Sequence, residues 1–155
     1  MVYACGVSTE SKPLLYKESV RNIRINILEI LHKAQASHLG SSMSIVEILT
    51  AMYSVANIGK ILSHADDRDR IIVSKGHAAA ATYAVMHEFG LLDRKDLLSY
   101  HHKGSKLQGH VSHGVRYVEH STGALGHGLS VGVGHAIFLK RNMKLQNIAV
   151  QRPFR

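Results

Sequence analysis

The sequence predicts an α/β fold in which a parallel sheet is flanked by helices. Helical and strand-like segments alternate in the order helix, helix, strand, helix, helix, loop, helix, strand. Such an order favours a layered structure with right-handed crossovers between parallel strands. The chain has 155 residues, of which 45% are hydrophobic, and this is enough to bury a core. No repeat or linker divides it, so we expect one domain or part of one.

The first part of the chain reads as two helices joined by a turn. Residues 13–35 place apolar side chains at steps of three and four, which is typical of a buried helical stripe (Val20, Ile23, Ile27, Ile30, Leu31 and Ala34). Small residues at 37–42 predict a turn. The Ser-Ile-Val-Glu pattern at 44–47 predicts a capping box that starts a helix over 45–56. Residues 57–67 are expected to be a connection.

The middle of the chain predicts a buried strand that leads into a helix. Residues 69–76 form a short apolar run that ends in a glycine turn. An alanine-rich helix over 77–89 follows, and Gly90 is expected to end it. Asp93 is then expected to cap a further helix that runs to about His101.

The last part predicts a long loop, a helix and a second strand. Residues 103–122 show no periodicity and are rich in Gly, Ser and His. A structureless stretch of this length inside a compact domain usually has a function. Residues 125–141 are predicted to be helical, and 147–150 to begin a strand.

Composition limits the classes of function. The 19 Lys and Arg against 11 Asp and Glu give a charge of +8, but the basic residues are scattered and there is no Trp, which argues against a nucleic-acid partner. Small anions such as phosphates fit this charge better. No apolar run approaches the ~18 residues of a membrane span. The single Cys5 and the absence of an evident secretory signal favour a reducing, cytoplasmic location.

A glycine-rich segment at 120–134 is the first candidate binding site. Gly123, Gly126 and Gly128 would let the backbone approach a ligand and adopt positive φ. The helix that follows directs free N–H groups back at this loop, so an anion such as a diphosphate would fit there. A tight turn before a closely packed helix explains the same residues, and both interpretations stay open.

Histidines supply the other candidates, with 7 of the 12 between His101 and His135. His77 follows the predicted strand, at the end where ligands bind in parallel sheets, and a helix N-terminus there would lower its pKa. It could equally cap a turn. His38 and His110, each taken alone, are explained more simply as surface histidines than as catalytic ones. The pair His110 and His113 could hold zinc, but the cysteine is distant and no acidic partner is suitably spaced, so a metal is not favoured.

Taken together, four motifs resemble one family. They are Ala36-Ser-His-Leu-Gly-Ser-Ser-Met-Ser, Arg70-Ile-Ile-Val-Ser-Lys-Gly-His, Gln108-Gly-His and Glu119-His-Ser-Thr-Gly-Ala-Leu-Gly-His-Gly, in this order. The chain, over about 16–150, resembles the N-terminal, thiamine-diphosphate-binding part of transketolase. It is most similar to the separate N-terminal subunit of two-chain transketolase-like enzymes. The resemblance implies a thiamine-diphosphate-binding fold and the transfer of a two-carbon ketol unit between sugar phosphates.

The resemblance also implies roles for single residues. His38 matches the histidine near the reacting carbons, and His110 matches the one that orients the hydroxyls of the donor sugar. His77 matches the histidine on the diphosphate side of the cofactor. Gly123, Ala124 and Leu125 match the backbone loop over the cofactor. The implied partner is a complementary C-terminal subunit, which would supply the activating Glu, or a second copy of the chain.

The chain departs from the family at its end. The family strand that corresponds to Ile148 runs into a Gly-Asp-Gly-Glu motif whose Asp binds Mg²⁺. Here the sequence reads Ile148-Ala-Val-Gln-Arg-Pro-Phe-Arg155, and the pyrimidine-binding half is missing. We therefore expect residues 1–155 to be an incomplete domain, truncated before the metal motif, that binds Mg²⁺ and cofactor poorly and is inactive alone. The alternative is a non-catalytic binding or regulatory module.

Overall fold

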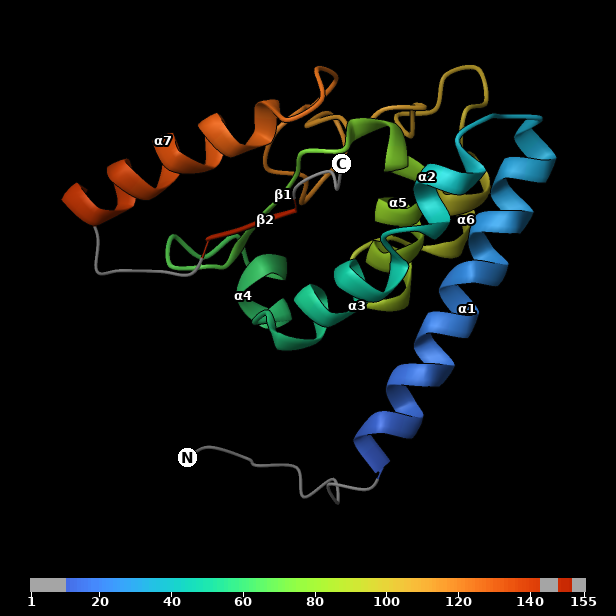
Figure 1. The fold of residues 1–155 in the computed structure, drawn as a ribbon, viewed down its shortest axis with the longest axis horizontal. Coiled ribbons are helices and arrows are strands. Elements are labelled where there is room, and N and C mark those ends of the chain that lie inside the picture. Colours follow the sequence, from blue (N-terminus) through green and yellow to red (C-terminus); the bar gives the residue numbers. More distant parts are fainter. Residues whose placement is uncertain (1–10, 143–147, 152–155) are drawn as a thin grey trace.

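The structure is a computed structural model that describes residues 11–142 and 148–151 (Figure 1). Its elements follow the predicted alternation of helices and strands, with additional short helices. They are α1 (Ser11–Ala34), α2 (Leu39–Met43), α3 (Val46–Val55), α4 (Ile58–Leu62), β1 (Arg70–Val73), the 3₁₀ helix η1 (Gly76–Ala78), α5 (Ala79–Glu88), α6 (Arg94–Leu98), α7 (His127–Asn142) and β2 (Ile148–Gln151).

The core lies among α1, α3 and α5. Every residue from 79 to 86 in α5 is buried, and its small alanines allow the neighbouring helices to approach closely. Helix α1 packs on α5. Its Ile23, Ile27 and Ile30 are each at most 1% exposed, which confirms the predicted stripe. None of the helices within the described ranges is both long enough and apolar enough to span a bilayer.

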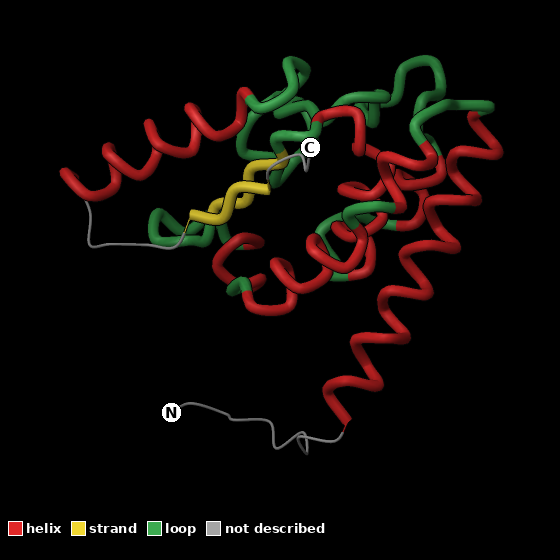
Figure 2. Tube along the Cα trace, in the orientation of Figure 1, coloured by secondary structure: helices red, strands yellow, loops and turns green. Residues whose placement is uncertain are grey.

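The two strands pair in parallel, from Arg70 opposite Ile148 to Val73 opposite Gln151. Figure 2 shows this pair lying between α7 and the other helices, and α7 packs against both strands. Within the described residues the sheet consists of these two short strands. The element order and the parallel pairing agree with the predicted α/β class, whereas a full parallel sheet with helices on its faces is not seen there.

The predicted capping box at 44–47 is wrong. Ile45 precedes α3 and makes no side-chain cap. The Ser44 hydroxyl instead donates to the Ser41 carbonyl at 3.0 Å and accepts from the Lys75 ammonium at 2.8 Å. Glu47 pairs with Arg24 of α1. Both capping side chains therefore have tertiary partners that compete with the local motif.

Two segments predicted to lack structure contain short helices. The expected turn at 37–42 includes most of α2, which begins after His38, and the expected connection at 57–67 includes α4. The Asn57 side chain caps α4 by accepting from the Lys60 N–H at 3.1 Å. The predicted cap at Asp93 is confirmed by a 2.7 Å bond from the Asp96 N–H. Residues 103–122 form a loop, as predicted.

Substitution of Gly76 tests how the long loop packs on the end of β1. A Cβ at this position would lie 2.1 Å from the Thr122 carbonyl oxygen, and backbone cannot move aside as a side chain can. We expect Gly76→Ala to lower the free energy of unfolding by at least about 2 kcal/mol. In the control, Gly40→Ala in α2, the new methyl meets open space, and a change within about 1 kcal/mol is expected. Urea unfolding measures both, and equal midpoints for the two variants would contradict the packing.

Candidate functional site

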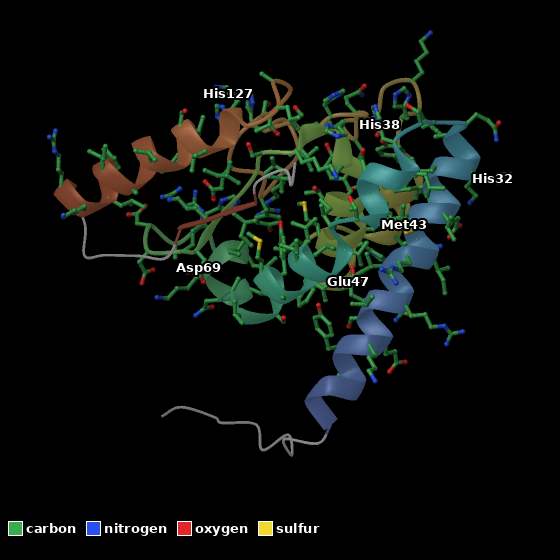
Figure 3. All side chains as sticks on the ribbon, in the orientation of Figure 1. His32, His38, Met43, Glu47, Asp69 and His127 are labelled. Carbon is green, nitrogen blue, oxygen red and sulfur yellow. The ribbon has the colours of Figure 1, made fainter. Side chains whose placement is uncertain are left out.

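The structure brings His38, His77 and His110 together. The ring centroids of His38 and His77 are 5.5 Å apart, those of His38 and His110 are 5.7 Å apart, and those of His77 and His110 are 6.5 Å apart. The three residues come from the start of α2, from η1 and from the long loop. His38 lies in the upper part of the view in Figure 3. Three residues that are far apart in sequence therefore form one cluster, called here the histidine cluster.

Backbone hydrogen bonds hold the histidine cluster in place. The Val111 N–H donates to the Gly76 carbonyl at 3.0 Å, which joins the loop that carries His110 to η1. The hydroxyl of buried Tyr83 donates to the His110 carbonyl at 3.3 Å. His38 has a φ of 73°, a left-handed conformation, at the turn into α2. His38 and His110 are exposed and His77 is half-buried, so the cluster opens to solvent.

Lys75 places a positive charge beside the histidine cluster. Lys75 lies beside it and donates from its ammonium to the Ser41 carbonyl at 3.1 Å and to the Ser44 hydroxyl. Burial lowers the pKa of Lys75. Among the described residues, no carboxylate forms an ion pair with Lys75 or with the three histidines. An anion placed here would meet hydrogen-bond donors that are not paired with a carboxylate of the described residues.

The pKa of His77 is lowered, first by desolvation and then by the charges of Lys75, His38 and His110. The predicted direction is confirmed, but the predicted cause is wrong. Sequence reasoning assigned the shift to a helix N-terminus, whereas burial is the largest contribution. A neutral imidazole at neutral pH follows, and it can donate one hydrogen bond while its other nitrogen accepts.

The glycine-rich segment docks on the same end of β1. The Thr122 hydroxyl donates to the Val73 carbonyl at 2.6 Å. The Gly128 N–H donates to the Ser74 hydroxyl at 2.9 Å, and the Gly126 N–H reaches the Ser74 carbonyl at 3.4 Å. These bonds anchor residues 122–128, called here the glycine loop, beside Ser74, two residues before Gly76. The glycine loop and the histidine cluster therefore adjoin one strand end.

The predicted residues Gly123, Ala124 and Leu125 lie between these anchors and are exposed. No described residue accepts a hydrogen bond from their backbone N–H groups. Three donors are thus left for solvent or a ligand. The sequence also predicted that the glycines of this loop have positive φ and let the backbone approach a ligand closely. The three glycines differ in how far this is confirmed.

Gly126 has a φ of +88°, as predicted for the loop. Gly128 lies so close to Ser74 that a Cβ would be 2.8 Å from the serine Cβ, which fits the alternative of a closely packed helix. Its φ is not positive, so that part of the prediction is wrong for Gly128, and the approach to a ligand stays a prediction. Gly123 has neither property, because a Cβ there would meet open space and its φ is not positive. The predicted positive φ at Gly123 is therefore wrong. The predicted approach of its backbone to a ligand stays a prediction.

Sequence reasoning missed a second group of histidines near the start of α7. The rings of His120 and His127 are 5.6 Å apart, and His113 Nδ1 lies 2.6 Å from the Ser121 hydroxyl. The pKa of His120 is lowered by desolvation and then by the charges of His127, His135 and His113. The excess of histidine between 101 and 135 was the available signal. Within the described residues, no three His, Cys, Asp or Glu side chains could together hold a metal ion.

Cavities lie elsewhere on the described molecule. One of about 720 Å³ is lined mainly by residues 90–93, 102–107 and 115–117, and another of about 430 Å³ lies between Arg70 and α7. Neither is lined by a residue of the histidine cluster. The cluster is an open surface site, and its chemistry rather than its volume marks it as the candidate.

Residues 15–149 match the family described as the thiamine diphosphate binding domain of transketolase. The chain belongs to the transketolase family. This confirms the resemblance drawn from the four motifs, and the match covers the histidine cluster and the glycine loop.

Two relatives are each named as one subunit of an apulose-4-phosphate transketolase. The protein from Phocaeicola vulgatus is 39% identical over 118 residues, which cover 76% of this chain and 42% of the relative. The protein from Actinobacillus succinogenes is 44% identical over 116 residues, which cover 73% of this chain and 42% of the relative. The chain thus spans less than half the length of these relatives.

Solved structures agree on the fold. The transketolase from Leishmania mexicana matches with a TM-score of 0.70 at 29% identity, covering 79% of this chain and 19% of that one. The transketolase from Campylobacter jejuni matches with the same TM-score at 27% identity, covering 83% of this chain and 20% of that one. The described fold is therefore consistent with a thiamine-diphosphate-binding α/β fold.

The lowered pKa of His77 predicts how the stability of the protein depends on pH. The unfolded chain takes up a proton on this imidazole as the pH falls below about 6.5, whereas the folded chain resists doing so. We expect the NMR titration midpoint of His77 to lie below 6.5 and the melting temperature to fall as the pH drops from 7 to 5. The fall should be smaller in His77→Asn. A midpoint at or above 6.5 would contradict the described environment.

Proposed function

We propose that this chain forms the diphosphate side of a transketolase-type active site, which transfers a two-carbon ketol unit between sugar phosphates with thiamine diphosphate. The observation that carries the proposal is the gathering of His38, His77 and His110 at the strand end where the glycine loop docks. Membership of the transketolase family supports it. On this proposal residues 15–149 contribute to the thiamine-diphosphate-binding domain of the enzyme.

The residues present fit a diphosphate. Gly123, Ala124 and Leu125 offer N–H groups that have no acceptor among the described residues, and Lys75 adds a positive charge near His77. For Mg²⁺ the described residues contain no group of three His, Cys, Asp or Glu side chains that could hold the ion. Residues 152–155, where the chain departs from the family's metal motif, lie outside the described residues.

Thiamine diphosphate, when bound, supplies the carbon nucleophile that receives the ketol unit. His77 is proposed to donate a hydrogen bond to a diphosphate oxygen. His38 and His110 are proposed to bind the sugar hydroxyls, so that an imidazole nitrogen accepts a hydroxyl proton as a carbon–carbon bond breaks and returns it when a new bond forms. The backbone N–H groups at 123–125 would hold the diphosphate of the cofactor.

We infer that the partner is a complementary transketolase subunit, with a second copy of the chain as the alternative. Two relatives are named as subunits. Helix α7 also presents an apolar stripe at four-residue spacing, with Leu129, Val133 and Ile137 exposed by 36%, 51% and 50%. In Figure 1 this helix extends away from the other helices. Such a stripe is suited to a protein interface.

Titration with thiamine diphosphate and Mg²⁺, followed by NMR, tests the site. We expect the His77 ring and the amides of residues 123–125 to shift, since they face the diphosphate. His77→Gln should weaken binding by about tenfold or more, because a hydrogen bond to a charged group contributes about 1.5–3 kcal/mol. The control is His64→Gln, at an exposed histidine that stacks on Tyr117. Shifts confined to other residues would contradict the proposal.

Substitution on α7 tests the partner. Val133→Asp and Ile137→Asp place a charge on the apolar stripe, so we expect each to abolish copurification with a subunit that carries the second half of a transketolase. Melting temperature and circular dichroism of the variant chain should stay near those of the parent, because both positions are exposed. The control is Lys140→Asp on the same helix. Unchanged copurification of both stripe variants would show that the stripe is not the interface.

A further inference from the structure

We propose that Glu119 is a positioning residue, whose ion pairs with Arg68 and Arg70 set the conformation of the glycine loop and thereby the affinity of that loop for a diphosphate. The ligand part of this inference rests on the proposed function. The positioning part rests on contacts within the chain.

Glu119 is shared by two arginines in a nearly dry environment. Its Oε1 accepts from Arg68 Nε at 2.8 Å, and its Oε2 accepts from Arg68 Nη2 at 3.1 Å and from Arg70 Nη1 at 2.9 Å. The Glu119 side chain is 10% exposed, and those of Arg68 and Arg70 are 17% and 14% exposed. Two-point pairing of this kind fixes orientation as well as distance.

The arginines belong to the base of β1. Arg70 is the first residue of the strand, and Arg68 Nη1 donates to the Ala65 carbonyl at 3.2 Å. Arg70 Nε is buried and has no hydrogen-bond partner among the described residues, so the bond to Glu119 is a main compensation for that guanidinium. Glu119 thus joins the loop to the first residue of β1 and to the segment just before it.

The connection from Glu119 to the glycine loop is short. Three residues later, Thr122 donates from its N–H to the Val111 carbonyl at 3.1 Å and from its hydroxyl to Val73. The far side of the loop is held at Ser74 through Gly126 and Gly128. The exposed residues 123–125 therefore lie between two anchors.

Anchoring at both ends limits the conformations of residues 123–125 before any ligand arrives. A preorganised loop binds more tightly, because less conformational entropy is lost on binding. Without the ion pairs, the segment before Thr122 loses its link to Arg68 and Arg70, and the loop has more conformations to lose. Glu119 therefore acts on ligand binding through the conformation of the loop and not by contacting the ligand.

Glu119→Gln removes the charge and keeps the shape of the side chain. We expect hydrogen exchange of the Thr122 and Gly128 amides to rise by about tenfold or more, while amides of α5 keep their protection. Binding of thiamine diphosphate with Mg²⁺, measured by NMR titration, should weaken by about tenfold. The matched control is Glu47→Gln, whose carboxylate pairs with Arg24 on the surface and is 49% exposed. It should change neither measurement.

A second variant covers the case in which Glu119→Gln does not fold. Arg68→Lys keeps the charge but loses the two-point geometry, and it should change both measurements in the same direction by less. A lower melting temperature with unchanged exchange at Thr122 and Gly128 would overturn the proposal, since Glu119 would then only stabilise the fold. If the parent chain shows no response to thiamine diphosphate, the proposed function fails, and the exchange measurement still decides the positioning role.

Discussion

The contact between the end of β1 and the loop that crosses it determines the shape of the candidate site. Gly76 leaves room for the Thr122 carbonyl where any side chain would collide, and the Thr122 hydroxyl bonds to Val73. The glycine loop and η1, with His77, therefore meet at the same strand end. Ser74 lies between them and binds two amides of the loop. If this contact opened, both parts of the site would separate.

The electrostatics of the site follow from the same crowding. Lys75 and His77 are partly buried where α2, η1 and the loop meet, and desolvation lowers the pKa of each. His77 is therefore a neutral hydrogen-bond donor beside a lysine whose hydrogen bonds go to Ser41 and Ser44. The charge of +8 includes Lys75 at this site, which forms no ion pair with a carboxylate among the described residues.

Sequence reasoning succeeded where local forces decide the structure. The apolar spacing of Ile23, Ile27 and Ile30 and the cap at Asp93 depend on residues a few positions apart. It failed at the capping box, because the Ser44 hydroxyl accepts a hydrogen bond from Lys75, which lies 31 residues away in the sequence. The histidine cluster could be expected only from the family resemblance, because no periodicity links segments so far apart. Nothing local relates Glu119 to Arg68, 51 residues earlier.

The Arg68, Arg70 and Glu119 group is better explained by geometry than by stability. Removing charges from water costs several kcal/mol per ion, and well-packed apolar residues often stabilise a fold as much as a buried ion pair does. Apolar side chains in place of these three residues would allow the loop to pack in several positions. Two guanidinium groups that bind one carboxylate allow few positions, because their hydrogen bonds are directional. A strand base that must hold a ligand loop in one conformation gains from this directionality. The charged group lies where the long loop ends and the glycine loop begins, which is where such control over loop geometry would act.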